Sequence, residues 1–287
     1  MLIQNIRKIL KFRSDQKKFK LTKFTRDVKK INSSSYDVIL IGSDIVWNYK
    51  WAFLGHDPIY FGNGLNPEKL ISYAPSFGDI SPDSELPDFV IDGLKRFSKI
   101  SVRDDNSAKI VGKALGLKPQ VVLDPTLICD LFGEEKDNDI AEDYLLVYAF
   151  KLKPEEIKSA IRFAEENGLK TVSVAYSNKW CDENIVSVGP FEWLGYFKKA
   201  KYILTSTYHG TIFSIKYGKT FAVSTNDAIA NKINTLLDIC DLRERIVKSD
   251  AKVELILNSE IDYTKVKSLL DPKAKASLDY LQGSLRV

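Results

Sequence analysis

The chain has only two histidines, and one of them stands where a predicted strand gives way to a helix. Residues 201–206 read as a strand, and His209 and Gly210 precede a helix predicted over residues 211–217. Ligands of parallel α/β sheets bind beyond the carboxyl ends of strands, and the amides of Gly210 and Thr211 would face an anion at the helix start. An imidazole beside an anion can give or accept a proton near neutral pH. His209 is therefore a candidate acid–base residue; a packing or capping role is the alternative.

Small polar residues follow two further predicted strands. After the strand at residues 36–42, the segment GSDIVWN offers Ser43 and Asp44 to sugar hydroxyls and the flat face of Trp47 to a sugar ring. Either polar residue could equally cap a helix. Ser76 follows the next strand in a loop of small residues, a composition that is also typical of an ordinary turn. We interpret the four residues as candidate substrate contacts.

Arg103 ends a third predicted strand, residues 100–104. A guanidinium at a strand end can clamp a carboxylate or a phosphate through two parallel hydrogen bonds. An ion pair with Asp104, Asp105 or Asp124 is the alternative. We predict a catalytic role for Arg103 on this basis.

The order of the elements predicts the fold. Short apolar, β-branched runs alternate with helical segments throughout, which is the pattern of an α/β protein with parallel sheets. The polar stretch 133–143 has neither periodicity and marks a boundary. We predict two Rossmann-like domains facing across a cleft, at residues 1–135 and 136–257. A helical segment at 258–287 is expected to pack back on the first domain.

Composition excludes several classes of protein. The net charge of +4 is too small to indicate a nucleic-acid partner, and much of the excess lies before residue 31. That basic segment is predicted to be solvated, with peripheral contact to anionic lipid as the alternative. His56 reads as a loop residue, because a zinc site needs three or four ligands. Three widely spaced cysteines and the lack of a long apolar run predict a cytoplasmic protein, with the inner membrane surface as an alternative place.

Taken in order, seven segments resemble the polysaccharide pyruvyl transferase family. Each alone is weak, but the ordered series is specific and spans residues 36 to about 247. The segments are YDVILIGSDIVWN, DPIYFGN, KLISYAPSFGD, ISVRDDNSAKIV, VVLDPTL, TSTYHGTIFSIKYGKTFAV and NKINTLLDICDLRERIV.

The resemblance implies a GT-B-like arrangement of the two domains, with the first domain on the acceptor side and the second on the donor side. It implies transfer of a pyruvyl group from phosphoenolpyruvate to a sugar or lipid-linked oligosaccharide of a bacterial surface polysaccharide, forming a cyclic ketal. By motif position the functional histidine is His209, the arginine is Arg103 and the basic residue of the later helix is Lys232. Phosphoenolpyruvate is a co-substrate, and the reaction requires neither a metal nor another cofactor.

One departure from the family pattern concerns the first domain. Family members usually begin with a strand and a glycine-containing loop well ahead of the GSD motif. Here about forty residues precede Gly42, and they read as basic and helical. The resemblance therefore predicts a first domain that lacks its first βα unit. A GT-B glycosyltransferase that uses a nucleotide sugar, and a non-catalytic carbohydrate-binding or assembly partner, are the alternative functions.

Overall fold

The computed structural model describes residues 2–25, 27–52, 56–248 and 252–286, which form two compact units. The first unit comprises Met1–Thr22, Asp130–Asn226 and Leu242–Thr264; the second comprises Lys23–Cys129, Asp227–Asp241 and Lys265–Val287. Both units are thus discontinuous in sequence. The predicted boundaries differ from them: the N-terminal arm belongs with the later part of the chain, and the segment 227–241 belongs with the earlier part.

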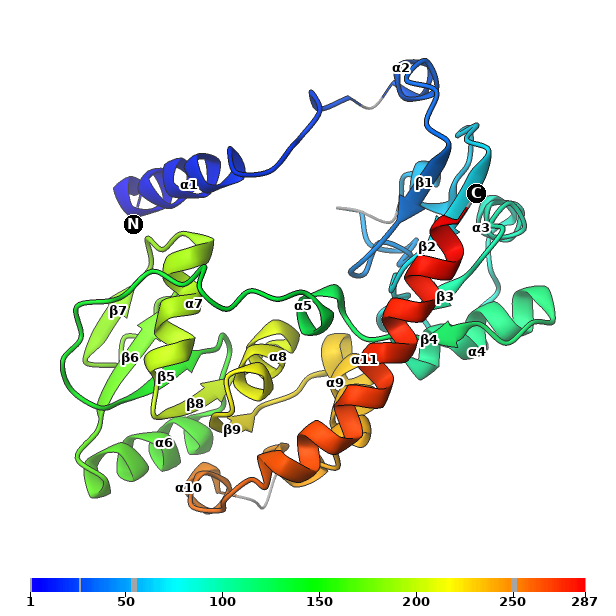
Figure 1. Cartoon of the computed structure of the whole chain (residues 1–287). Coiled ribbons are helices and arrows are strands. Elements are labelled where there is room, and N and C mark those ends of the chain that lie inside the picture. Colours follow the sequence, from blue (N-terminus) through cyan, green and yellow to red (C-terminus); the bar gives the residue numbers. More distant parts are fainter. Residues whose placement is uncertain (1, 26, 53–55, 249–251, 287) are drawn as a thin grey trace. The chain divides into compact units, whose positions relative to one another are not determined.

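A parallel sheet forms the centre of the first unit (Figure 1). Within the described residues its strand order is β7-β6-β5-β8-β9. The strands are β5 (Tyr144–Tyr148), β6 (Lys170–Val174), β7 (Glu183–Ile185), β8 (Tyr202–Thr205) and β9 (Thr220–Val223). Because β5 is buried along most of its length between two neighbours, it reads as a continuous apolar run rather than as an alternation.

Helices cover both faces of this sheet. On one face, Leu145 and Val147 pack in a core with residues of α6 (Pro154–Glu166) and α10 (Val253–Leu257). On the other face, Tyr148 lies 5.6 Å from Phe197 of α7 (Pro190–Lys199), measured between ring centroids, and Phe197 contacts Phe213 of α8 (Tyr208–Lys216). The unit also contains α1 (Leu2–Gln16) and the 3₁₀ turn η2 (Arg243–Arg245).

The second unit contains two pairs of parallel strands. β1 (Val38–Ile41) pairs with β2 (Lys69–Ser72), and β3 (Ser101–Val102) pairs with β4 (Gln120–Val121). Backbone hydrogen bonds join β2 to the segment entering β3: Ser98 N donates to Leu70 O at 2.8 Å and Ser72 N donates to Lys99 O at 3.1 Å. The carboxyl ends of all four strands therefore lie along one edge.

An aromatic core and a long helix stabilise these strands. Trp47, Phe61, Phe77 and Phe97 are buried together. The helix α11 (Tyr263–Leu285) is tied to the strands through Tyr280, whose hydroxyl donates to Ser72 O at 2.9 Å. The remaining elements are α2 (Val28–Asn32), η1 (Pro58–Phe61), α3 (Asp88–Leu94), α4 (Asp105–Leu115), α5 (Pro125–Ile128) and α9 (Asp227–Cys240).

The fold is α/β with parallel sheets, as the alternation of elements predicts. The strand signals predict that residues 36–42, 70–75 and 100–104 are adjacent parallel strands of one sheet and that residues 201–206 lie in a second sheet. The pairing of 36–42 with 70–75 and the separate sheet of 201–206 are confirmed. The third strand differs from the prediction, because β3 forms a separate pair with β4 and is joined to β2 through the parallel bridge between Ile71 and Lys99. Over the described part of the chain, none of the helices combines the length and the apolar character needed to cross a membrane.

Candidate active site

His209 lies in the first turn of α8, not ahead of it. The helix begins at Tyr208, three residues before the predicted start, and Thr207 is its N-cap residue. The imidazole is half-buried, and its ring centroid lies 5.6 Å from that of Tyr208. Because β8 ends at Thr205, His209 stands just beyond the carboxyl end of a strand inside a parallel sheet. This is the position where ligands of such sheets bind.

The predicted anion hole at Gly210 and Thr211 is wrong, because both amides are used within the helix. Gly210 N donates to the Thr207 Oγ1 at 2.9 Å, and Thr211 N donates to Thr207 O at 3.1 Å. Thr211 is fully buried and its hydroxyl donates to the same carbonyl. The cap therefore satisfies the donors that an anion would have needed.

Glycine is required at position 210 for a different reason. A Cβ atom there would lie 2.0 Å from Oγ1 of Thr205 and 2.7 Å from Oγ1 of Thr207. The same Thr205 hydroxyl donates to Tyr148 O at 2.8 Å, so it cannot move without breaking a bond to the central strand. The glycine lets the first turn of α8 pack directly on the strand end, which holds the backbone of His209 in place.

Arg103 forms a buried ion-pair network in the second unit. Its side chain is fully buried; Nη1 lies 2.7 Å from Oδ2 of Asp124, and Nη2 lies 2.9 Å from Oδ1 of Asp44. Asp124 is also buried and caps α5, whereas the side chain of Asp44 is 49% exposed. The ion pair between Arg103 and Asp124, which the sequence offers as the alternative to ligand binding, is present. Because both terminal nitrogens bind aspartates, the predicted clamp of Arg103 on a ligand is wrong for this arrangement.

Ser76 and Asp104, which precedes α4 and follows Arg103 in sequence, form a further buried hydrogen bond. Ser76 is fully buried, and its hydroxyl donates to Oδ2 of Asp104 at 2.6 Å. The other oxygen of Asp104 accepts from Ser107 N at the start of α4. Ser76 is therefore a structural residue rather than the substrate contact that was predicted, because its hydroxyl already has a buried acceptor.

Lys232 lies in the same network. The residue is buried in α9, which is held to the unit by bonds from Asn231 to Gly78 O at 3.1 Å and from Asp105 N to the Thr235 hydroxyl. Burial, followed by repulsion from the Arg103 cation, lowers the pKa of Lys232 to about 8, while nearby aspartates oppose the shift. Two cations thus meet the carboxylates of Asp44, Asp104 and Asp124. In this cluster three carboxylates lie beside two cations.

The GSDIVWN loop is only partly available to a ligand. Ser43 and Asp44 are half-buried, and Asp44 has a φ of 80°, a left-handed conformation that costs roughly 1–3 kcal/mol for such a residue. This conformation holds the half-exposed carboxylate of Asp44 at Arg103. Trp47 is fully buried in the aromatic core, and its Nε1 donates to Tyr60 O at 2.8 Å. The predicted sugar platform at Trp47 is therefore wrong.

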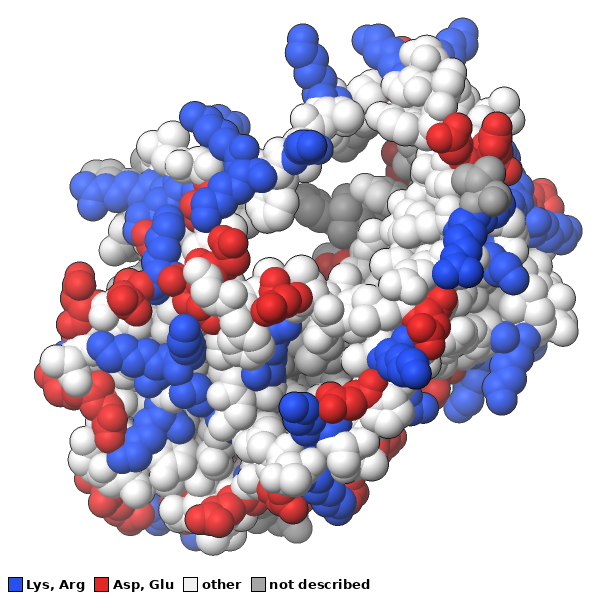
Figure 2. All heavy atoms as spheres, viewed as in Figure 1, with Lys and Arg blue, Asp and Glu red and all other residues white. Residues whose placement is uncertain are grey.

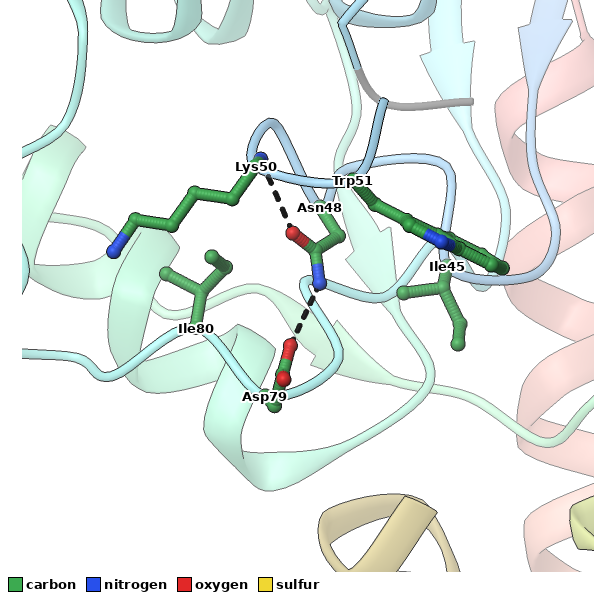
Figure 3. A pocket seen from close by; sticks show the side chains of 6 residues that line it. All are labelled: Ile45, Asn48, Lys50, Trp51, Asp79 and Ile80. Carbon is green, nitrogen blue, oxygen red and sulfur yellow. Dashed lines mark hydrogen bonds between the residues drawn. The ribbon is translucent and has the colours of Figure 1, made fainter. Parts of the chain in front are cut away.

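A pocket of about 450 Å³ lies beside this loop (Figure 3). Its lining combines Trp51, which is 43% exposed, with polar groups of Asn48 and Asp79; Nδ2 of Asn48 donates to Oδ1 of Asp79 at 2.7 Å. Ile45, Lys50 and Ile80 complete the lining. Sequence reasoning missed Trp51, although an aromatic residue beside Asn48 and Lys50 was the available signal.

The predicted residues divide between the two units. His209 belongs to the first unit, whereas Arg103, Asp44 and Lys232 belong to the second. That they share one cleft stays a prediction. His56 is exposed. In the ranges that the structure describes, His, Cys, Asp and Glu form no group of three suited to a metal ion.

Comparison with known proteins identifies the family and the fold. The family model described as polysaccharide pyruvyl transferase matches residues 4–228. Trehalose-6-phosphate synthase OtsA is similar in structure, with a TM-score of 0.51 and 9% identity over 91% of this chain and 75% of that one. The UDP-GlcNAc 2-epimerase of Methanocaldococcus jannaschii has a TM-score of 0.50 and 12% identity over 85% of this chain and 72% of that one.

Those structures show the fold alone, an α/β fold of Rossmann-like units as in GT-B enzymes. No curated protein matches the chain.

Proposed function

The chain belongs to the polysaccharide pyruvyl transferase family, and we propose that it transfers a pyruvyl group from phosphoenolpyruvate to two hydroxyls of a sugar in a bacterial surface polysaccharide. The product is a cyclic ketal. The acceptor is a sugar or a lipid-linked oligosaccharide, and the reaction takes place on the cytoplasmic side. It requires no metal or cofactor besides the co-substrate.

One observation carries the proposal: a half-buried imidazole stands just beyond a strand end, on a backbone fixed by buried threonines. Protonation of the methylene carbon of phosphoenolpyruvate needs an acid that works near neutral pH. Histidine is the side chain whose ordinary pKa suits that task. We assign this role to His209.

The proposed reaction has three steps: protonation of phosphoenolpyruvate, addition of one hydroxyl, and loss of phosphate with ring closure. His209 protonates the methylene carbon, which becomes a methyl group, and the adjacent carbon becomes electrophilic. An acceptor hydroxyl adds to that carbon, and its proton restores the imidazole. The bond to phosphate then breaks, and the second hydroxyl closes the ketal while its proton leaves with the phosphate.

Lys232 suits proton transfer better than anion binding. Its cluster has more carboxylates than cations, so it would attract a trianionic donor poorly. An amine with a pKa of about 8 can accept the proton of the second sugar hydroxyl and pass it to the departing phosphate. We assign Lys232 to proton transfer from the second hydroxyl of the acceptor sugar. The half-exposed carboxylate of Asp44 accepts a hydrogen bond from the acceptor hydroxyls, and Arg103 holds Asp44 in position.

This role predicts a pH dependence. The neutral amine of Lys232 is scarce below its pKa and predominates above it, whereas the acid His209 loses its proton as the pH rises. The histidine contribution cancels in the ratio of the wild-type kcat/KM to that of Lys232→Met, so this ratio should rise as the pH passes through about 8. The corresponding ratio for Lys113→Met, at an exposed lysine, should stay near one. Initial rates between about pH 6.5 and about pH 9.5 measure both ratios. A wild-type to Lys232→Met ratio that falls above about pH 8 would show that Lys232 is needed as a cation.

The pocket beside Asp44 suits the acceptor sugar. A partly exposed indole presents a flat apolar face to the C–H groups of a pyranose ring, and amide and carboxylate groups bind its hydroxyls. Trp51, Asn48 and Asp79 supply these groups. Ile45, which lines the pocket, directly follows Asp44 in sequence. A sugar bound in the pocket would therefore lie close to Asp44 and to the cluster of Lys232.

Replacing Trp51 by alanine tests this assignment. We expect KM for the acceptor to rise by about tenfold, because one lost aromatic contact is worth roughly 0.5–1.5 kcal/mol beyond its buried area. KM for phosphoenolpyruvate should stay unchanged. Trp51→Phe should restore much of the loss, and Tyr36→Ala, at a tyrosine of similar exposure outside the pocket, should have no effect. An unchanged acceptor KM in Trp51→Ala would place the acceptor elsewhere.

The reaction itself is tested with the surface polysaccharide of the source cells after mild acid has removed its ketals. We expect the protein to release inorganic phosphate from phosphoenolpyruvate only when the glycan is present, and to attach an equal amount of pyruvate to it. Growth of the glycan from a nucleotide sugar would identify a glycosyltransferase instead. Glycan binding without phosphate release would identify a non-catalytic partner.

A further inference from the structure

The N-terminal helix α1 contacts the first unit through its polar face. Nζ of Lys8 donates to Ala175 O at 3.2 Å, and Nζ of Lys11 lies 2.7 Å from a carboxylate oxygen of Glu192. Asp15 is buried and pairs with Lys136 at 3.4 Å. Residues 8, 11 and 15 are spaced by three and four positions, so they share one face of the helix.

Close packing confirms that this polar face is the docked one. A Cβ atom at Gly189 would lie 2.7 Å from Oδ2 of Asp15 and 3.5 Å from Cβ of Lys11. Gly189 is the N-cap residue of α7, so the glycine allows α1 to approach the start of that helix. Burial would raise the pKa of Glu192, but the hydrogen bond from Lys11 and the Gly189 amide outweigh it and the pKa is lowered. Close packing and an ion pair therefore hold α1 against the start of α7.

The apolar face of α1 points the opposite way. At 100° per residue, Ile6, Ile9 and Leu10 lie on the side away from Lys11 and Asp15. They are 49%, 53% and 59% exposed. A helix of a soluble protein normally buries its apolar side and exposes its polar side, and α1 has the reverse orientation. Isolated exposed apolar residues are ordinary, but three adjacent ones on one helix face indicate an interaction surface.

Basic and apolar residues continue along this segment. Arg7 borders the apolar face, and Arg13 lies on the same side of the helix, one turn beyond Ile9 and Leu10. Both arginines are exposed, and Figure 2 shows basic side chains gathered over this helix. Beyond the helix, Phe19 and Leu21 are 61% and 66% exposed and have Lys20 between them. An apolar face bordered by arginine and lysine is the composition that binds the interface of an anionic bilayer, because the apolar side chains enter the acyl boundary while the cations meet the headgroups.

We propose that α1 docks the protein on an anionic lipid surface, with Ile6, Ile9 and Leu10 inserted at the interface and Arg7 and Arg13 on the lipid headgroups. The charge of the segment favours lipid over a second copy of the chain, since two copies of α1 would bring like charges together. The proposal does not depend on the reaction. It would bring the protein to the surface that carries lipid-linked sugars.

Vesicle sedimentation of the full chain tests the proposal. We expect binding to phosphatidylcholine vesicles that contain about one third phosphatidylglycerol, and weak binding to pure phosphatidylcholine. Ile9→Ser with Leu10→Ser should reduce binding to the anionic vesicles by about tenfold or more, and Arg7→Gln with Arg13→Gln should do so as well. Leu255→Ser, at a leucine of α10 that is 63% exposed, serves as the matched control and should bind like the wild type.

Two results would overturn the proposal. One is equal binding of the wild type and both α1 variants to anionic vesicles, which would place lipid contact elsewhere or nowhere. The other is a wild-type dimer in solution that Ile9→Ser with Leu10→Ser converts to a monomer without lipid, which would make a second copy the occupant. Each substituted residue is exposed, so unchanged circular dichroism spectra should accompany every comparison.

Discussion

Replacing His209 by alanine is expected to lower turnover by about 10²–10⁴-fold, the usual contribution of a positioned acid. The melting temperature should change little, because the imidazole is half-buried while the bonds that fix its backbone are made by Thr205, Thr207 and Gly210. Steady-state phosphate release and a thermal melt of the same preparation measure the two effects.

His56→Ala is the matched control, since His56 is the other histidine of the chain and is exposed. It should leave both turnover and melting temperature near the wild-type values. If His209→Ala turns over phosphoenolpyruvate at the parent rate, or if it unfolds, the residue is structural and the assignment of the acid is wrong.

Replacing Asp124 by alanine is expected to reduce the free energy of unfolding by about 3–5 kcal/mol, the usual effect of removing one partner from a buried ion pair. Arg103 would lose its ion pair with the buried carboxylate of Asp124 and keep the pair with the half-exposed carboxylate of Asp44. The caps that Asp124 makes to the amide and hydroxyl of Thr126 would be lost as well. Denaturant unfolding at neutral pH measures the change.

An exposed ion pair in the same unit provides the control. Asp92 lies 3.4 Å from Lys95 on the surface of α3, and both side chains are more than half exposed. Asp92→Ala should therefore change the free energy of unfolding by less than about 1 kcal/mol. If Asp124→Ala is as stable as Asp92→Ala but has lost activity, Arg103 binds a substrate, as the sequence alone suggested.

The sequence predicts the helices and strands of this protein better than it predicts which of them pack into the same unit. The apolar run of β5 becomes a central parallel strand because it is buried along most of its length under covering helices, and that burial is visible in its composition. The grouping of α9 with the earlier part of the chain is not visible, since it depends on tertiary contacts such as that of Asn231 with Gly78 O. Arg103 and Asp124 likewise meet only because β3 and β4 are neighbours in space.

Two local details of the site, the N-cap of α8 and the burial of Trp47, could not be predicted from the sequence either. Several residues from Thr205 to Thr207 could cap a helix, and the chain uses the last of them, which places Gly210 inside the turn and occupies its amide. The two tryptophans Trp47 and Trp51 are four residues apart and equally suited to a sugar by type. Packing against Phe61 and Phe77 decides that Trp47 is core, and no property of the residue itself reveals this.

The most direct test of the account is a thermal melt of the purified protein with phosphoenolpyruvate, since it requires no knowledge of the acceptor. A ligand at one hundred times its Kd stabilises the folded state by about 2.7 kcal/mol, so we expect the melting temperature to rise by several degrees. UDP-N-acetylglucosamine at the same concentration should have no effect. Stabilisation by the nucleotide sugar and none by phosphoenolpyruvate would contradict the account.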